Sequence, residues 1–313
     1  MPCAVTLRTF FFAAQHWLHC RADFLRASRM ISKTSYLIGL IDSSIAGSLT
    51  PAMHEEEGRI LGLNYVYRRI DLQALNLEPS ALPNLLSAAE RIGYDGLNIT
   101  YPCKQSVIPL LDDLDADARA LGAVNTVVLK EGKRIGYNTD WSGFARAFQR
   151  GLPGVPMERV VQLGAGGAGA AVAHAALTMG ARALTLFDSA DAHAASLASE
   201  LAARFPDRMV TSSGDLRDTL ASASGLIHAT PTGIAKLPGL PLPAEYLHKE
   251  LWVAEIVYFP LETELLKTAK ALGCRTVSGG MAVCQAVDAL RIFTGREPDA
   301  ERMFEHFQRL LER

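Results

Sequence analysis

The residues whose types and spacing point most directly to chemistry form a glycine-rich loop. Gly164, Gly166 and Gly169 have the spacing G-x-G-x-x-G, after an apolar segment and before an alanine-rich one. In such a loop the first glycine permits a tight turn, the second lets backbone approach a pyrophosphate, and the third lets a helix pack closely on a strand. Helix N-terminal amides then bind the phosphates. The loop predicts a dinucleotide site, the alternative being a glycine-rich turn without a ligand.

A carboxylate stands where such a site would hold the adenosine ribose. Asp188 follows the apolar segment 183–187 and lies 188 − 164 = 24 residues after Gly164. Its carboxylate can accept hydrogen bonds from the ribose hydroxyls and would repel a 2′-phosphate. No arginine or lysine occurs in 189–191 to bind that phosphate. The sequence therefore favours NAD, with NADP as the second candidate. The alternative role for Asp188 is to cap the helix that follows.

The elements that must position these residues form a repeating pattern in the C-terminal part. Short apolar segments, each typical of a buried strand, alternate with longer segments of helical periodicity. The expected strands are 160–163, 183–187, 226–229, 253–257 and 275–277, and the expected helices are 168–179, 192–204, 262–272, 281–293 and 301–311. Strands that alternate with helices in this way predict a doubly wound parallel sheet.

A second α/β unit precedes this one. Its expected strands are 36–41, 64–70 and 96–100, with a hairpin of 124–129 and 134–137 around Glu131-Gly132, and its expected helices begin near Pro51, at 81 and at 104. Thr50 is the expected cap of the first helix, and the third spans 104–111. A helix over 141–150 then leads into 151–156, where two glycines and two prolines indicate a domain boundary.

Composition excludes several classes of protein. The 313 residues carry a formal charge of -2, with 49% hydrophobic and 20% charged residues, whereas a general nucleic-acid binder is usually more basic. The five cysteines are widely spaced without a CxxC pair, so we expect no structural metal site or disulfide framework, and a cytoplasmic location. The longest uncharged stretch, 160–181, contains five glycines, and we interpret it as a βα unit rather than a membrane span.

Residues 1–34 differ from the rest of the chain. The first 29 residues hold four arginines and one acidic residue, Asp23. Their longest apolar run, 10–14, is shorter than the core of about 7–15 residues that a signal peptide needs. We expect an N-terminal extension, either a disordered or targeting segment or the translation of an upstream start codon. The last interpretation is favoured, with Met30 as the initiator.

Seven ordered segments give the chain a specific resemblance to a known family. They are 47–54 (Gly-Ser-Leu-Thr-Pro-Ala-Met-His), 98–105 (Asn-Ile-Thr-Tyr-Pro-Cys-Lys-Gln), 122–126 (Gly-Ala-Val-Asn-Thr), 138–140 (Asn-Thr-Asp), 164–169, 257–266 (Val-Tyr-Phe-Pro-Leu-Glu-Thr-Glu-Leu-Leu) and 279–286 (Gly-Gly-Met-Ala-Val-Cys-Gln-Ala). In these segments the chain resembles the shikimate dehydrogenase family, most closely its NAD-preferring quinate/shikimate dehydrogenase branch. The resemblance covers about residues 35–312.

The resemblance implies a catalytic pair and a substrate site. The family oxidises a ring hydroxyl of a cyclic polyhydroxy carboxylate to a ketone, and Lys104 and Asp140 match its catalytic residues. A lysine can shuttle the hydroxyl proton, and the aspartate can hold the ammonium in place. The positions that match substrate-binding residues are Ser48, Thr50, Thr100, Asn125, Tyr258 and Gln285. Hydroxyl and amide groups suit a polyol, because a hydroxyl both donates and accepts hydrogen bonds.

The resemblance also extends the cofactor site beyond the glycine loop. The matching positions are Gly164, Ala165, Gly166, Gly167, Ala168, Asp188, Thr230, Val257, Gly280 and Met281. Val257 and Met281 are equally consistent with ordinary core packing. The chain departs from the family pattern at Tyr101 and Cys103, on either side of Pro102, so the substrate-side strand is expected to pack differently. We expect Cys103 to be a small, half-buried thiol rather than a nucleophile.

Together these features predict an α/β protein of two domains. The substrate-binding and catalytic domain comprises 35–140 and 284–313, and a Rossmann-type domain for NAD(P) comprises 141–283. The expected activity is reversible oxidation of shikimate or quinate with NAD, by a monomer or homodimer without a metal. The alternatives are a dehydrogenase of an amino or otherwise modified analogue and a non-catalytic NAD-binding sensor. Neither nucleic acid nor a membrane is expected as a partner.

Overall fold

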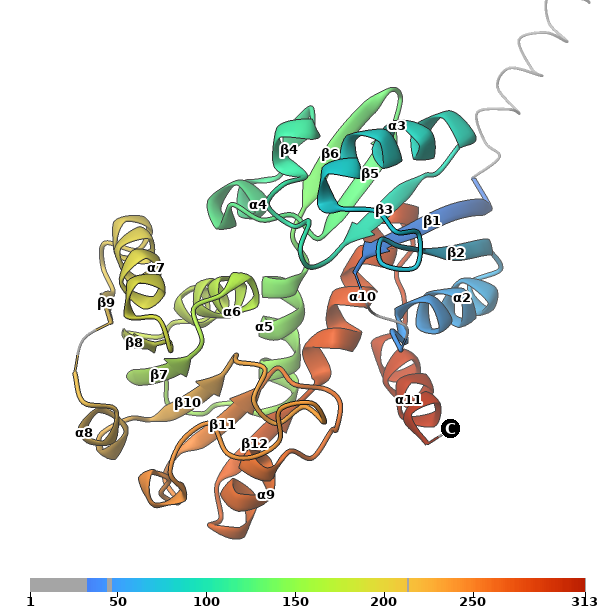
Figure 1. Cartoon of the computed structure of the whole chain (residues 1–313). Coiled ribbons are helices and arrows are strands. Elements are labelled where there is room, and N and C mark those ends of the chain that lie inside the picture. The colour runs from blue at the N-terminus through green and yellow to red at the C-terminus, as the bar shows by residue number, and fades with distance from the viewer. Residues whose placement is uncertain (1–32, 44–46, 213, 313) are drawn as a thin grey trace, which may run out of the picture.

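The structure is a computed structural model, and it describes residues 33–43, 47–212 and 214–312. The predicted extension over 1–34 therefore lies almost entirely outside the described residues. Two six-stranded sheets dominate the described part, one built before and one after residue 150 (Figure 1). The predicted fold class, α/β with two sheets of which one is doubly wound, is confirmed.

The N-terminal sheet is mixed, with the strand order β2-β1-β3-β5-β6-β4. Its strands are β1 (Ser35–Asp42), β2 (Asn64–Asp71), β3 (Gly96–Ile99), β4 (Asp113–Leu114), β5 (Thr126–Lys130) and β6 (Lys133–Tyr137), and its helices are α2 (Thr50–Ile60), α3 (Leu82–Ile92) and α4 (Ala116–Leu121). β1 runs parallel to β2 and β3, and β5 is antiparallel to β3. The predicted β5–β6 hairpin forms, and Glu131 and Gly132 both take positive φ in its turn.

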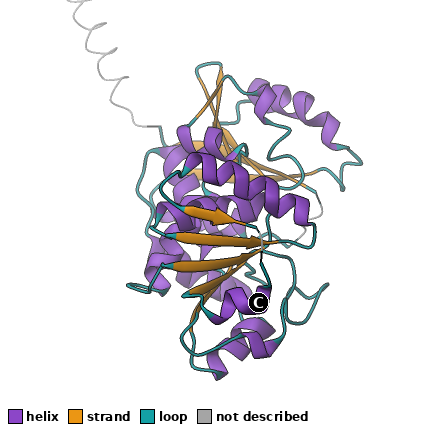
Figure 2. Ribbon diagram, turned by 90° about the vertical axis from the view of Figure 1, so that its left-hand side faces the viewer, coloured by secondary structure: helices purple, strands orange, loops and turns teal. Residues whose placement is uncertain are grey.

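The C-terminal sheet is fully parallel, with the order β12-β11-β10-β7-β8-β9. Its strands are β7 (Arg159–Leu163), β8 (Ala183–Phe187), β9 (Met209–Thr211), β10 (Gly225–His228), β11 (Trp252–Glu255) and β12 (Arg275–Ser278), and its helices are α6 (Gly167–Thr178), α7 (Asp191–Arg204), α8 (Leu216–Ala221) and α9 (Glu264–Ala271). One hydrophobic cluster covers each face of this sheet, and Figure 2 shows helices on both sides of its strands. The strand order reverses direction between β7 and β10, which is where such sheets bind ligands.

Three helices run between the sheets or return from the second sheet to the first. They are α5 (Asp140–Gly151), α10 (Gly280–Thr294) and α11 (Ala300–Leu311). α5 and α10 approach so closely that a Cβ on Gly143 would lie 2.7 Å from the backbone nitrogen of Gln285. α10 and α11 pack on α2 through a cluster that includes Met53, Val283 and Phe307. This contact accords with a C-terminal segment that returns to the N-terminal sheet, and the domain boundaries themselves stay predictions.

Two local predictions are wrong. Residues 104–111 form turns and a short 3₁₀ helix, Ile108–Leu110, instead of an α-helix, because Pro109 has no amide hydrogen to donate within one. Thr50 is the first residue of α2 rather than its cap, and Leu49 occupies the cap position without a side-chain hydrogen bond. The short elements α4, α8, β4 and β9 were not predicted. Among the residues that the structure describes, no helix is long and apolar enough to cross a membrane.

Candidate active site

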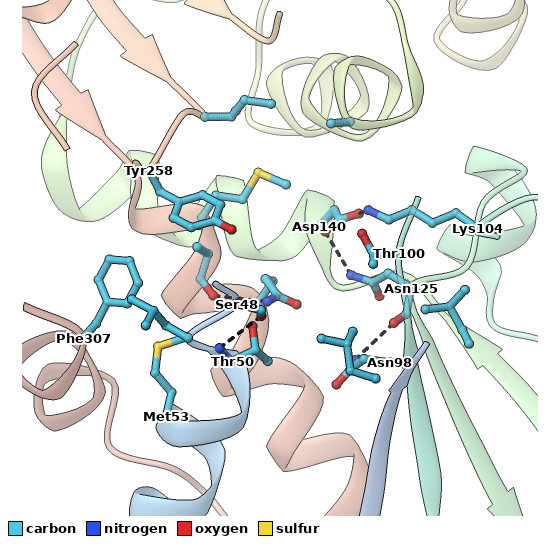
Figure 3. Close-up of a pocket in the computed structure, with 18 residues that line it drawn as sticks. Ser48, Thr50, Met53, Asn98, Thr100, Lys104, Asn125, Asp140, Tyr258 and Phe307 are labelled. Carbon is cyan, nitrogen blue, oxygen red and sulfur yellow. Dashed lines mark hydrogen bonds and ion pairs between the residues drawn. The ribbon is translucent and has the colours of Figure 1, made fainter. Parts of the chain in front are cut away.

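A cavity of about 240 Å³ lies between the two sheets, and both sheets contribute to its wall. Of the predicted residues it brings together Ser48, Thr50, Thr100, Lys104, Asn125, Asp140, Ala168, Tyr258, Met281 and Gln285. Figure 3 shows Lys104 and Asp140 on one side of this space, and Ser48, Thr50 and Tyr258 on the other. Residues more than 200 positions apart in the sequence therefore meet at one site, which is the arrangement expected of an active site.

Lys104 and Asp140 form an ion pair at the cavity wall. The Lys104 Nζ lies 2.6 Å from the Asp140 Oδ2, and the two side chains are 23% and 8% exposed. Lys104 is thus partly buried rather than fully solvated at the surface. Asp140 is held at the start of α5, directly after β6, where its backbone amide donates to the side chain of Asn138. The pair places the amino group of Lys104 beside a carboxylate whose position is fixed by the start of α5.

Asn125 fixes the orientation of Asp140. Its Nδ2 donates to the other carboxylate oxygen of Asp140 and to the hydroxyl of Thr139, both at 3.0 Å. Its Oδ1 accepts from the Thr139 amide at 2.8 Å and from the Thr126 hydroxyl at 2.9 Å. Both ends of the amide are therefore engaged with protein, so Asn125 supports the carboxylate in addition to lining the cavity. That it binds a ring hydroxyl stays a prediction.

The polar wall opposite the ion pair is built around the start of α2. Ser48 is buried, and its Oγ accepts a 3.4 Å hydrogen bond from the Thr50 amide. The positive end of the α2 dipole lies at this point and favours an anion. Tyr258 faces the same space from the loop after β11, and burial raises the pKa of its phenol, so the hydroxyl keeps its proton as a donor. These groups suit a carboxylate, and that they bind a substrate stays a prediction.

Eight lining residues were not predicted: Leu40, Leu49, Met53, Asn98, Ile99, Ile256, Ala282 and Phe307. Seven of them are apolar, so the cavity wall combines non-polar surface with its polar groups. Asn98 is the polar exception, and its Oδ1 accepts from the Tyr67 hydroxyl at 2.7 Å. Asn98 lies within the segment 98–105 that carries the resemblance, so a sequence signal for it existed. For Phe307, on α11, no local signal existed.

The glycine loop connects β7 to α6, as predicted. Gly164 has a φ of +99°, and a Cβ on Gly169 would lie 2.3 Å from the carbonyl oxygen of Gly164. A Cβ on Gly166 or Gly167 would meet nothing within 4 Å, so these two glycines leave open space in front of the first turn of α6. Gln162 holds the loop from beneath by donating to the carbonyls of Gly164 and Gly169, both at 2.8 Å. The loop fits the phosphates of a dinucleotide.

Asp188 directly follows β8 and lies beside this loop. Its carboxylate accepts hydrogen bonds from the amides of Ala165 at 2.7 Å and Ala190 at 3.0 Å. Burial acts to raise its pKa, but the bonds from the Ala190 and Ala165 amides bring it below the usual range, so the group is ionised. Asp188 does not cap α7, because Ala190 occupies the cap position. His193, one turn into α7, places its Nδ1 3.7 Å from the carboxylate.

A second cavity of about 920 Å³ adjoins the first and shares Leu49, Ala168, Ile256 and Tyr258 with it. Two further predicted cofactor residues, Thr230 and Val257, line it. Gly280 lines neither cavity, because a Cβ there would lie 2.9 Å from the Cβ of Ala147 on α5. Its role toward a cofactor stays a prediction. The two cavities together extend from the glycine loop to the ion pair.

Two other reactive side chains, those of Cys103 and His54, are buried in the protein interior. Cys103 is fully buried, more than predicted, and burial raises the pKa of its thiol. His54 contacts the hydroxyl of Tyr65 at 3.0 Å, and burial lowers its pKa to about 3, so it is a neutral hydrogen-bonding group. Within the described ranges, no group of three or more histidine, cysteine, aspartate or glutamate side chains could hold a metal ion.

Several known proteins are similar to this chain in sequence and in structure. A family model described as the shikimate dehydrogenase substrate binding domain matches residues 40–127. A shikimate dehydrogenase (NADP⁺) of Streptomyces avermitilis is 59% identical over 87% of this chain and 95% of its own length. A quinate/shikimate dehydrogenase (NAD⁺) of Corynebacterium efficiens is 47% identical over 86% and 96%. The structure of quinate dehydrogenase from Corynebacterium glutamicum in complex with NAD superimposes with a TM-score of 0.83 at 46% identity, covering 88% of this chain and 99% of that one.

Proposed function

Because the chain belongs to the shikimate dehydrogenase family, we propose that it reversibly oxidises a ring hydroxyl of shikimate or quinate to a ketone with a nicotinamide cofactor. The observation that carries this proposal is the Lys104–Asp140 pair, with its 2.6 Å contact, in the cavity between the two sheets. Ala168 of the glycine loop lines the same cavity. A proton-transfer pair and a dinucleotide loop that face one space are what a hydroxyl oxidation requires.

The chain's own residues supply the proton chemistry. When bound, the nicotinamide cofactor accepts the hydride from the carbon that bears the hydroxyl. Lys104, as its uncharged amine, receives the proton that leaves the hydroxyl oxygen and becomes an ammonium, so that one hydride and one proton depart as the carbonyl forms. Asp140 holds the amino group of Lys104 in position, and Asn125 keeps that carboxylate oriented. In the reverse direction Lys104 returns the proton to the carbonyl oxygen.

The proposed substrate is a cyclic polyhydroxy carboxylate. Its carboxylate would be bound by Ser48, Thr50 and Tyr258 at the N-terminus of α2, and its ring hydroxyls by Thr100, Asn125 and Gln285. The apolar residues of the cavity wall support this assignment, because a cyclohexane ring presents carbon–hydrogen faces between its hydroxyls. The chain's net charge of -2 gives no general attraction for an anion, so local dipoles and hydroxyls carry the binding.

NAD is proposed as the preferred cofactor, with NADP as the second. The ionised carboxylate of Asp188 supports this preference, because it would repel a 2′-phosphate and accept bonds from a free ribose. Similar proteins are named for each of the two cofactors. We also propose a cytoplasmic enzyme, monomeric or homodimeric, without a nucleic-acid partner. The unpaired state of Cys103, Cys274 and Cys284 accords with a reducing compartment.

One experiment separates this function from its two alternatives. Purified protein is assayed with shikimate, quinate and their amino analogues, each with NAD and with NADP. We expect kcat/KM to be highest for shikimate or quinate. Turnover restricted to an amino analogue would replace the substrate assignment. Cofactor binding without turnover of any compound would favour the sensor, although a sensor has no need of the Lys104–Asp140 pair.

A further inference from the structure

A buried chain of polar side chains lies beneath the second cavity and has no part in the proton chemistry proposed above. It joins Thr230, His228 at the end of β10, Glu255 at the end of β11, and Thr263 at the start of α9. The side chains of His228 and Glu255 are both 0% exposed. Burying a carboxylate and an imidazole is costly unless their hydrogen bonds are satisfied, so the arrangement must be specific.

The contacts form one line from the start of α9 to the second cavity. The Thr263 hydroxyl accepts from the Leu266 amide and contacts the Glu255 Oε2, so its own hydrogen goes to the carboxylate. The other oxygen, Oε1, lies 2.7 Å from the His228 Nδ1, and a carboxylate accepts the hydrogen of that nitrogen. When the second ring nitrogen, Nε2, carries no hydrogen, it presents a lone pair. The Thr230 hydroxyl lies 2.5 Å from Nε2 and can donate its hydrogen inward to that lone pair.

A Thr230 hydroxyl that donates to His228 has a defined polarity toward the cavity. The Thr232 amide donates to one lone pair of the Thr230 Oγ1 at 3.2 Å. The second lone pair remains, and Thr230 lines the second cavity together with Ala168 and Val257. A serine or threonine hydroxyl normally rotates and can either donate or accept. When the imidazole takes this hydrogen, Thr230 can only accept from a ligand.

We propose that the Nε2 of His228 carries no hydrogen, and that His228 and Glu255 are positioning residues that hold Thr230 as a hydrogen-bond acceptor for the nicotinamide-ribose half of the cofactor. That half carries two kinds of donor, the carboxamide N–H and the ribose O–H. The inference rests on the proposed function, because that function assigns the second cavity to the cofactor. We do not expect His228 and Glu255 to affect binding of the adenine and pyrophosphate half, for which the glycine loop and Asp188 are proposed. The expected effect is therefore confined to one half of the dinucleotide.

The test compares ligands that differ in how much of that half they contain. Calorimetry gives the Kd of NAD, ADP-ribose and ADP for the full chain. Thr230→Val removes the hydroxyl at nearly constant volume and is expected to weaken NAD about fivefold to tenfold and ADP not at all. Thr230→Ser keeps the hydroxyl and is expected to bind NAD like the unaltered protein. If ADP-ribose weakens as much as NAD, the ribose is the donor, and if it does not, the carboxamide is.

His228→Asn tests the positioning role itself. The asparagine amide can take the place of Nδ1 and donate to Glu255, but it is too short to reach Thr230. We expect about twofold to fivefold weaker NAD binding, unchanged ADP binding, and no further loss when Thr230→Val is added, because both variants interrupt one path. His248→Asn, at a histidine that contacts Glu250 away from both cavities, is the matched control and is expected to change nothing.

A spectroscopic measurement covers the case in which His228→Asn does not fold. In ¹⁵N-histidine-labelled protein, one imidazole with a neutral Nδ1–H tautomer should have an Nε2 signal that moves in Thr230→Val. Absence of such a signal overturns the inference, as do additive losses in the double variant or an equal loss of ADP affinity. These results leave the proposed function standing if the protein still oxidises shikimate or quinate. Failure of the unaltered protein to bind NAD and NADP would remove both.

Discussion

The two halves of the cleft are built in opposite ways. On the substrate side, most of the proposed functional groups belong to side chains, and Ser48, Lys104, Asp140 and Gln285 come from four separate elements or loops. At the proposed phosphate site the backbone of one contiguous loop, 164–169, supplies the groups, and Gly166 and Gly167 leave open space there. A substitution on the first side removes a chemical group, whereas a substitution on the second adds an obstacle.

The supports behind the two halves differ as well. A buried polar network links Asp140 through Asn125 and Thr126 to Asn98 and Tyr67. The glycine loop is backed by Gln162 alone among the side chains that bond its carbonyls in the described structure. The substrate half thus depends on many satisfied side-chain bonds, and the loop depends mainly on close backbone packing.

The largest expected effect comes from removing the proton carrier of the substrate half. Lys104→Met is expected to lower kcat by about 10³-fold, because no other cation takes its place beside Asp140. The Kd of NAD should stay within about twofold, since the phosphate and ribose sites are unaltered. Steady-state kinetics and calorimetry measure the two quantities. Lys130→Met, at an exposed lysine of β5, is the control. Retention of more than a tenth of kcat in Lys104→Met would contradict the role of Lys104.

Two glycine substitutions separate packing from ligand space in the other half. Gly169→Ala puts a Cβ 2.3 Å from the Gly164 carbonyl oxygen, and we expect the free energy of unfolding to fall by about 2–3 kcal/mol and NAD binding to weaken together. Gly166→Ala meets no neighbour and has a permitted φ of −72°, so only NAD binding should weaken. Urea unfolding and calorimetry test both. Equal stability losses in the two variants would contradict this distinction.

A fall in pH should lower the stability of the substrate half through His54, a buried residue of α2. Burial lowers its pKa to about 3, so the folded protein keeps it neutral, while the unfolded chain takes up a proton below about pH 6.5. Stability therefore falls as the pH drops from 6.5 toward 3, by about 2 kcal/mol at pH 5 from this group. In His54→Asn the difference between unfolding free energies at pH 7 and pH 5 should shrink by that amount. An unchanged difference would refute the assignment. By contrast, the side chain of Gln162, which supports the glycine loop, has no titratable group, so we expect no such pH dependence from it.

The smallest expected effect concerns the side chain beside the glycine loop, at the proposed ribose site. Asp188→Asn removes the charge, and its single side-chain oxygen can keep the bond from only one of the Ala165 and Ala190 amides. The ratio of kcat/KM for NAD to that for NADP should fall about tenfold, because the repulsion of a 2′-phosphate is gone. Asp191→Asn, at an exposed acid three residues on in α7, serves as the control. A ratio that does not move would assign the preference to another group.

Sequence reasoning succeeded most where the signal was local. The bounds of β8 match the prediction, and the glycine loop and the Glu131-Gly132 turn form where expected, because each depends on neighbouring residues. It failed at 104–111, where Lys104 and its neighbours form turns rather than the predicted helix. The residues of the substrate side were proposed from the family resemblance, and no periodicity indicated that Met53 or Phe307 would line the cavity.

The amino-acid sequence by itself determined the parallel sheet, the glycine loop and the carboxylate after β8, because backbone conformation, hydrophobic period and charge act over a few residues. Only the tertiary structure decided that Lys104 meets Asp140 at 2.6 Å, that α11 brings Phe307 to the cavity, and that His228 joins Glu255 to Thr230. Each of these contacts joins separate elements. The packing of whole sheets and helices sets such distances, and no local pattern encodes them.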